Sequence, residues 1–292
     1  MYKVLQNANA CVMYKYICAF LLSVCLFFLP CCTAKRVETQ QFNAYMPRPF
    51  EDFFEEIIPL ENTTEIKNNV WNTEDVDLSY IDVHRKLIAF TFDDSPAKRL
   101  ENILAAFAEY NESNPDCKAT ATLFVNGGLV TEESLTSLRM ATALGFELGN
   151  HTQSHFDLTT LDSNVLQTEI ESTDNILSRI DGKPQHLLRP PFGRINDAVK
   201  TQLHVPVINW TIDTLDWSGV SAEEIYNSIF NNLFSGAIVL MHDGYQNTVD
   251  ALARLLPDLK EQGYQVVSVS ALAKIHGCAL RNGGEYIRLR KQ

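Results

Sequence analysis

From about residue 85 onward, short apolar segments alternate with longer helical segments, and this alternation restricts the fold more than any other feature. Strands separated by helices predict parallel βα units. The strand segments are mostly apolar on both faces, which is typical of strands that are covered on both faces. The predicted strands are 87–93, 120–126, 146–150, 187–190, 206–212, 237–242 and 265–269. The predicted helices are 98–110, 131–144, 162–180, 195–203, 221–233 and 247–262.

Seven such strands fit either an open doubly wound sheet or a barrel. A complete eight-stranded βα barrel takes about 250 residues, and this region spans roughly 190. No G-x-G-x-x-G sequence follows the first strand, so the fingerprint of a dinucleotide-binding sheet is absent. We therefore expect an α/β fold in the form of an incomplete (β/α)7 barrel.

The composition is that of a globular protein, because 46% of the 292 residues are hydrophobic. The formal net charge of -12 argues against a protein that binds nucleic acid through phosphate contacts. Five of the seven cysteines lie in the first 32 residues, which is neither a disulfide scaffold nor a zinc ribbon. Cys117 and Cys278 are the two others, and a disulfide between them would require the fold to bring them together.

The N-terminus has the three parts of an export signal. Lys3 and Lys15 precede a mostly apolar run at 17–29, and residues 32–34 resemble a cleavage site. We predict that residues 1–34 are a signal peptide or, because the run is shorter than a span of about 20 residues, an uncleaved signal anchor. Lipid attachment at a cysteine is a further alternative. The protein is thus expected outside the cytoplasm, either secreted or tethered to a membrane by this segment.

Residues 35–80 carry ten acidic and four basic residues without a sustained period. We interpret them as an acidic lead segment or linker. The principal domain is expected at residues 81–292.

Unusual polar residues cluster where the predicted strands end, which is where βα barrels build active sites. Asp93 and Asp94 follow the first apolar strand. Two adjacent carboxylates are costly to bury unless a cation compensates for them. The alternative is a helix cap, in which Asp94 or Ser95 precedes Pro96.

His151 and His155 follow the third predicted strand. Two imidazoles four residues apart can bind one metal, and a carboxylate would complete a three-ligand site with open positions for hydrolysis. Taken alone, this H-x-x-x-H pattern arises often by chance.

Three further groups follow later strands. A buried Arg189 requires a carboxylate partner, and the rigid turn after it leaves the backbone N–H groups of Phe192 and Gly193 available to an anion. The alternative is a rigid turn in which Arg189 forms a purely structural ion pair. His242, if paired with Asp213, would be an oriented general acid, whereas a lone histidine here would be structural.

Together the segments TFDDS, HTQSH, RPPFG, DTLDW and IVLMH resemble, in order, the five motifs of the polysaccharide deacetylase family, which is carbohydrate esterase family 4 with its NodB homology domain. The resemblance covers about residues 85–275 and implies the incomplete barrel of that family, with residues 81–292 as the catalytic domain. Ser95 replaces a glycine that is usual in the family, and Phe192 replaces a tyrosine.

The resemblance implies that Asp94, His151 and His155 bind a divalent metal, in the first place Zn²⁺, with Co²⁺ or another divalent ion as alternatives. It also implies that Asp93 takes a proton from the attacking water as general base. Arg189 would hold Asp93 ionised and in place.

The same resemblance assigns oxyanion stabilisation to the backbone N–H of Phe192. His242 would protonate the departing amine, oriented by Asp213. Trp217 and Leu240 would form the walls of the acetyl pocket, and Asp216 would have a supporting role.

The expected function is therefore metal-dependent removal of N-acetyl groups from a polysaccharide that contains N-acetylglucosamine, such as peptidoglycan or a chitin-like chain. One alternative is an O-deacetylase of acetylated xylan, and another is a catalytically silent carbohydrate-binding module. A serine hydrolase fits poorly because no G-x-S-x-G sequence is present. An iron oxygenase with two histidines and a carboxylate would not explain Arg189, Asp213 or His242. The expected partner is the acetylated polysaccharide and not nucleic acid, with the oligomeric state left open.

Overall fold

The computed structural model describes residues 69–291. The predicted signal segment 1–34 and most of the predicted acidic segment 35–80 lie outside the described residues. Within the described part of the chain, no helix is both long enough and apolar enough to cross a membrane.

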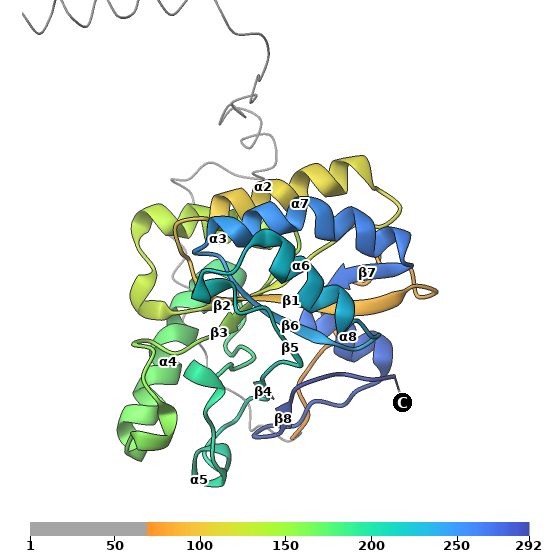
Figure 1. Ribbon diagram of the computed structural model, residues 1–292. Helices are drawn as coiled ribbons and strands as arrows, with labels where there is room; N and C mark the ends of the chain where they lie inside the picture. The colour runs from red at the N-terminus through yellow and green to blue at the C-terminus, as the bar shows by residue number, and fades with distance from the viewer. Residues whose placement is uncertain (1–68, 292) are drawn as a thin grey trace, which may run out of the picture. The chain divides into compact units, whose positions relative to one another are not determined.

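A sheet of parallel strands forms the centre of the described domain (Figure 1). Its strand order is β3-β2-β1-β6-β5, and β7 also pairs with β1. The α/β fold with an incomplete barrel is thus confirmed. The strands of this sheet are β1 (Lys86–Ser95), β2 (Thr122–Val125), β3 (Glu147–Asn150), β5 (Ile212–Asp213), β6 (Ile238–His242) and β7 (Tyr264–Val267).

The long strand β1 organises the sheet, because β6 lies along one of its edges while β7 and β2 share the other. Alternate residues of β1 belong to two different hydrophobic clusters. Ile88 and Phe90 pack in one cluster with residues of α2 (Leu100–Ser113) and α7 (Gln246–Glu261). Leu87 and Ala89 pack in the other with residues of α8 (Val269–His276). Both faces of β1 are therefore buried, as the unbroken apolar run predicts.

Helices follow most of the strands, and α2, α6 and α7 lie along one side of the sheet (Figure 1). Side chains cap several of them. Thr131 and Ser221 form capping boxes at the starts of α3 and α6, and Ser268 caps α8. The helices are α2 (Leu100–Ser113), α3 (Glu132–Ala143), α4 (Ser163–Asp181), α5 (Asp197–Lys200), α6 (Ala222–Asn231), α7 (Gln246–Glu261) and α8 (Val269–His276).

Two predicted strands differ from the structure. Segment 187–190 makes only single bridges, from Leu188 to Asn150 and to Val207, because the prolines that follow cannot continue a ladder. Segment 206–212 is divided into β4 (Val207–Ile208) and β5, since the chain changes partner between them. β4 pairs with the C-terminal strand β8 (Glu285–Tyr286), and β5 pairs with β6.

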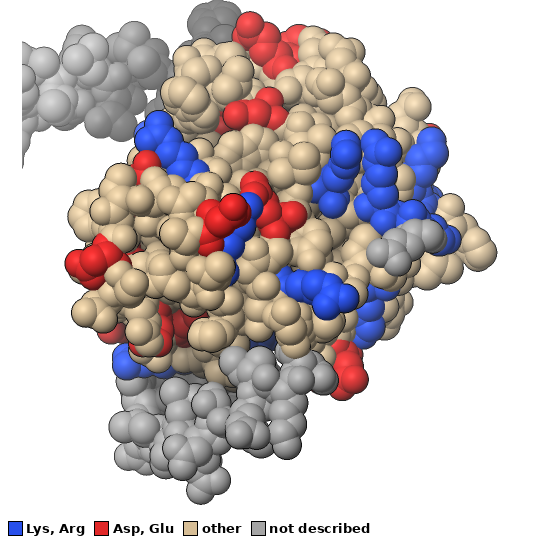
Figure 2. Space-filling model, turned by 90° about the horizontal axis from the view of Figure 1, so that it is seen from below, with Lys and Arg blue, Asp and Glu red and all other residues tan. Residues whose placement is uncertain are grey.

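The C-terminal tail, residues 281–291, runs past the residues that separate β4 from β5. After β8, Arg288 bridges to Ala237, and Leu289 is buried in the cluster that also contains Leu87 and Ala89 of β1. The tail also concentrates positive charge, because residues 281–291 hold four basic residues and one acidic residue. Figure 2 shows basic side chains gathered in one part of the face seen from below, although the whole chain is acidic.

The first described residues pack against the domain. Trp71 donates a backbone hydrogen bond to Leu280, and the Tyr80 hydroxyl lies 2.8 Å from the Thr120 hydroxyl. Cys117 and Cys278 are both free thiols, so the disulfide left open by the sequence does not form between them.

Candidate active site

The polar groups of the five motifs lie together at the carboxyl ends of the strands. Asp93 is directly opposite His242 in the register of β1 and β6. Leu188 bridges to Asn150, the last residue of β3, and thereby brings the RPPFG turn beside the HTQSH loop. The parallel sheet thus gathers side chains that are up to 149 residues apart, from Asp93 to His242.

Asp93 and Arg189 form a buried ion pair, with 2.8 Å between Arg189 Nη1 and Asp93 Oδ1. The guanidinium also donates to the Thr91 hydroxyl and to the carbonyl oxygen of Ile208, and it lies over the Phe124 ring. Burial alone would raise the pKa of Asp93, but the charge and hydrogen bond of Arg189, together with the charges of His151 and His242, outweigh burial and hold this pKa below its ordinary value. Asp93 is therefore ionised at neutral pH.

Asp94, His151 and His155 offer three ligand atoms that all lie within 4.8 Å of one another. Asp94 Oδ1 is 3.7 Å from His151 Nε2 and 3.4 Å from His155 Nε2. His151 Nδ1 lies 2.8 Å from the Arg189 carbonyl oxygen, which can only accept, so this nitrogen carries the proton and Nε2 is left with a lone pair.

These three residues fit a divalent transition metal. Burial lowers the pKa of His151 below its ordinary value, which favours the neutral ring that a metal binds. Two imidazoles and one carboxylate are a donor set of zinc hydrolases, and three protein ligands leave positions open for water and substrate.

Unusual backbone conformations are concentrated at this site. In the described residues, five non-glycine residues have a positive φ, and all five belong to the motifs. Such left-handed conformations are strained for residues with a side chain and persist where the surrounding structure fixes them. They are Asp94 (57°), Thr152 (67°), His155 (57°), Phe192 (60°) and Leu215 (54°).

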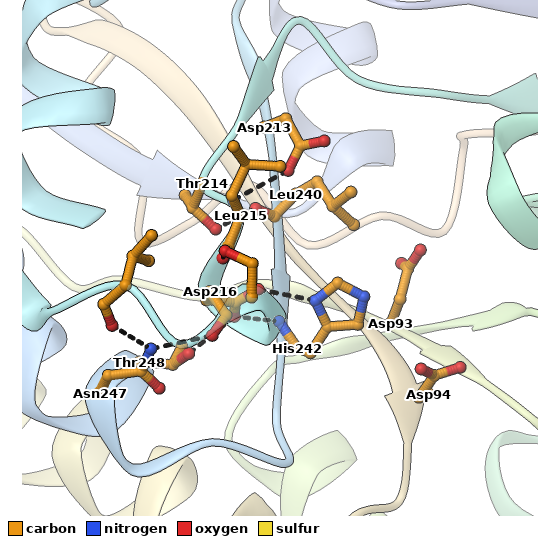
Figure 3. A network of polar contacts seen from close by, with 12 residues as sticks. Asp93, Asp94, Asp213, Thr214, Leu215, Asp216, Leu240, His242, Asn247 and Thr248 are labelled. Atoms are coloured by element: carbon orange, nitrogen blue, oxygen red, sulfur yellow. Dashed lines mark hydrogen bonds and ion pairs between the residues drawn. The ribbon is translucent and has the colours of Figure 1, made fainter. Parts of the chain in front are cut away.

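The expected pairing of His242 with Asp213 is wrong. His242 Nδ1 lies 2.8 Å from Asp216 Oδ1, and its backbone N–H donates to Asp216 Oδ2 at 2.7 Å. Figure 3 shows the imidazole between Asp216 and Asp93, with the Asp213 carboxylate directed elsewhere. The reason is local: Asp213 ends β5 and accepts from the Leu215 N–H, and the 3₁₀ turn η6 (Asp216–Ser218) then brings Asp216 beside His242.

Asp216 is itself fixed by the start of α7. The Thr248 hydroxyl donates to its Oδ2 at 2.7 Å, and the Asn247 amide donates to its backbone oxygen (Figure 3). Burial alone would lower the pKa of His242, but the hydrogen bond to Asp216 and the negative charges of Asp216, Asp93 and Asp94 together outweigh burial and raise this pKa above its ordinary value.

The three residues predicted to contact substrate differ in exposure. Phe192 is 59% exposed and its ring lies edge-on to His155, with 4.8 Å between the ring centres. Trp217 is 53% exposed beside Asp216, and Leu240 is buried in β6, two residues before His242. Only one of the two predicted backbone donors is available, because Gly193 N–H donates to the Pro190 oxygen, whereas Phe192 N–H has no acceptor among the described residues.

Sequence reasoning gave no role to several residues that support the site. Asn150, Asp174 and His186 form a buried polar group behind the HTQSH loop. Ser95 donates to the buried Asp243 carboxylate at 2.8 Å. The position of Asn150 directly before His151 was a usable signal, but a lone histidine before RPPFG has no spacing that distinguishes it.

Comparison with known proteins shows the family to which the chain belongs. Residues 81–205 match the family model described as polysaccharide deacetylase. The chain is 36% identical over 196 residues to the peptidoglycan-N-acetylmuramic acid deacetylase PdaC of Bacillus subtilis, over 67% of this chain and 40% of PdaC. It is 34% identical over 200 residues to a peptidoglycan-N-acetylglucosamine deacetylase of Bacillus cereus, over 65% of this chain and 90% of that protein.

A solved structure of a carbohydrate esterase has a similar fold. The family 4 acetyl xylan esterase of Clostridium thermocellum, in complex with a cobalt ion, aligns with a TM-score of 0.64 and 25% identity over 70% of this chain and 99% of that one. The chain therefore belongs to the polysaccharide deacetylase family, as its five motifs predict. It matches less than half of the length of PdaC.

Proposed function

We propose that this protein is an exported, metal-dependent hydrolase that removes N-acetyl groups from a polysaccharide containing N-acetylglucosamine. One observation carries the proposal: an ionised carboxylate, a three-ligand metal site and a histidine–aspartate pair surround the same carboxyl end of the sheet. A silent binding module would not require all three.

Asp94, His151 and His155 would hold the metal, with Zn²⁺ as the first candidate. When bound there, a divalent ion polarises an acetyl carbonyl and lowers the pKa of a water molecule. The cobalt ion in the complex of the Clostridium thermocellum esterase supports a divalent metal in general and leaves Co²⁺ as an alternative.

Asp93 acts as the general base. Its low pKa keeps it ionised and able to accept a proton from the attacking water, and Asp93 Oδ2 lies 3.7 Å from His151 Nε2, next to the metal ligands. Arg189 fixes its orientation. The free N–H of Phe192 is directed by its left-handed backbone and stabilises the negative charge that develops on the acetyl oxygen. Loss of one such donor typically lowers the rate by about 100- to 1000-fold.

His242 acts as the general acid and gives a proton to the departing amine. An amide requires this step more than an ester does, because an unprotonated amine leaves poorly. Asp216 holds the proton on Nδ1 and raises the pKa of the ring, so that the form with a proton on Nε2 to deliver persists to higher pH than in a free histidine. Trp217 and Leu240 form the walls of the pocket for the acetyl group.

Peptidoglycan is favoured over xylan as the substrate because both curated relatives named above act on peptidoglycan. They remove acetyl groups from different sugars, muramic acid in one and glucosamine in the other. O-deacetylation of xylan is the second candidate, supported by the acetyl xylan esterase of similar fold.

Acetate release tests the proposal. The zinc-loaded protein is incubated with peptidoglycan, chitooligosaccharides and acetylated xylan, and new amino groups are counted in the same samples. Acetate released in equal amount with free amines supports N-deacetylation. Release from xylan alone would assign the O-deacetylase function, and no release from any substrate by folded, metal-loaded protein would contradict the proposal.

A further inference from the structure

A buried charged cluster lies behind the metal site and takes no part in the chemistry described above. His186 is 1% exposed and lies between two carboxylates of α4. Its Nδ1 is 2.8 Å from Asp174 Oδ1, and its Nε2 is 3.2 Å from Asp181 Oδ1. Burial alone would lower the pKa of His186, but the hydrogen bonds to both carboxylates outweigh burial and raise it. The group is thus an imidazolium held by two aspartates.

This cluster is connected to the metal-binding loop through one atom. Asp174 Oδ1 accepts from His186 and also from the Asn150 amide, at 2.9 Å. Asn150 directly precedes the ligand His151, and its own Oδ1 accepts from the Thr152 backbone N–H at 2.8 Å. Thr152 is one of the left-handed residues, and its hydroxyl accepts from the backbone N–H of the ligand His155.

The same face of α4 contacts the rest of the loop. Glu169 is 6% exposed, and its backbone oxygen accepts from Gln153 N–H at 2.9 Å. Its carboxylate accepts from Ser154 N–H at 2.7 Å. Helix α4 packs beside β3 (Figure 1) and fixes the loop at Asn150, Gln153 and Ser154. His186 in turn fixes Asp174, the helix side chain that binds Asn150.

We infer that His186 is a positioning residue for the metal site, acting through Asp174 and Asn150 to hold the strained loop that presents His151 and His155. Residues that support metal ligands in this way typically change metal affinity by about 10- to 100-fold when they are replaced. The inference rests on the metal site of the proposed function but not on its substrate. A purely structural ion pair would stabilise the fold without changing metal affinity, so the two roles can be separated.

The test is a titration of the metal-stripped, full-length protein with Co²⁺ alone, followed by visible absorption, with Zn²⁺ competition as a check. His186→Gln is compared with the wild type and with His204→Gln, which changes an exposed histidine. Circular dichroism establishes that each protein is folded. We expect His186→Gln to raise the Co²⁺ dissociation constant by about 10- to 100-fold and to alter the absorption band, while His204→Gln matches the wild type.

A milder variant keeps the inference testable if His186→Gln does not fold. Asp181→Asn removes one of the two carboxylates and leaves the Asp174–His186 hydrogen bond in place, so a smaller rise in the dissociation constant is expected. A folded variant of either kind that lowers the unfolding temperature but binds Co²⁺ as the wild type does would overturn the inference. Because the titration contains no substrate, this outcome is independent of whether acetate release is observed.

Discussion

At the scale of single residues, Asp213 and Asp216 have different surroundings although they are three positions apart. The Asp213 carboxylate accepts a hydrogen bond from the Leu215 backbone, whereas Asp216 accepts from His242 twice, at Nδ1 and at the backbone N–H. Asp216 is also 1% exposed, so its charge acts on His242 with little screening by water.

Asp216→Asn should therefore lower kcat and move the alkaline limb of the pH–rate profile to lower pH. Asp216 raises the pKa of His242, and removing its charge lowers this pKa, so the acid form disappears at a lower pH. A general acid contributes about 100- to 10000-fold to the rate, which bounds the fall in kcat. Asp213→Asn is the matched control and should retain the wild-type limb. An unchanged limb in Asp216→Asn would exclude this orientation of His242.

Ser95 stabilises a buried carboxylate, that of Asp243. Burial raises the pKa of Asp243 to about 6, and the Ser95 hydroxyl opposes burial by donating to the ionised carboxylate. Ser95→Ala should lower the free energy of unfolding by about 1–3 kcal/mol at neutral pH. The loss should shrink below pH 6, where Asp243 becomes protonated in the folded state. Urea denaturation at several pH values measures it, with the exposed Ser163→Ala as control; a loss independent of pH would contradict this account.

At the scale of elements, the HTQSH loop, residues 151–155, lies between α4 and the 3₁₀ turn η3 (Gly127–Leu129). Gly128 N–H donates to the Gln153 carbonyl oxygen at 2.8 Å. A Cβ atom added at Gly128 would lie 2.6 Å from that same oxygen, which belongs to the backbone and cannot rotate away. The turn and the loop can approach this closely only because residue 128 lacks a side chain.

Gly128→Ala should therefore displace the loop, weaken Zn²⁺ binding and lower the free energy of unfolding by about 1–3 kcal/mol. Gly244→Ala is the control, since its added methyl group would meet Ala97 at an ordinary 3.7 Å. Isothermal titration with Zn²⁺ and thermal unfolding report the two effects. Equal behaviour of both variants would show that the close contact does not position the loop.

Sequence pattern predicted the elements better than it predicted their side-chain pairing. The unbroken apolar run of β1 is a local feature, and it corresponds to an element of the structure. The division of 206–212 could not be predicted, because it depends on β8, which lies about 80 residues later in the chain and is only two residues long. Helix α8 was missed because Val269–His276 has only eight residues, fewer than the window of about 11 residues over which a helical period is recognised.

The location of the candidate site could be predicted from the sequence, but part of its side-chain pairing could not. The carboxyl ends of parallel strands meet at one edge, which is why the five motifs could be placed together from the sequence. The choice between Asp213 and Asp216 depended on a left-handed turn at Leu215, and no residue pattern signals that turn in a leucine. The support from His186 depended on contacts with α4 that only the tertiary structure brings about.

At the scale of the whole described domain, the barrel is incomplete, and the C-terminal tail packs beside the residues that separate β4 from β5. Leu289 is 1% exposed, its N–H donates to Gly236, and its oxygen accepts from His276 Nδ1. Leu289→Ala should lower the free energy of unfolding by about 2–5 kcal/mol, as expected for a buried leucine.

Ile287→Ala is the control for the tail, because Ile287 lies two residues earlier and is 44% exposed. Urea denaturation should separate the two variants clearly. If Leu289→Ala were as stable as Ile287→Ala, the tail would not be part of the folded domain.

We propose that Asp93 acts as base beside a metal held by Asp94, His151 and His155. The direct measurement is acetate release from peptidoglycan by metal-stripped wild type, zinc-restored wild type and zinc-loaded Asp93→Asn, with bound zinc measured in each sample. We predict release only from the zinc-restored wild type, and one bound zinc in both loaded proteins. Full activity in the stripped protein, or full activity in zinc-loaded Asp93→Asn, would contradict the account.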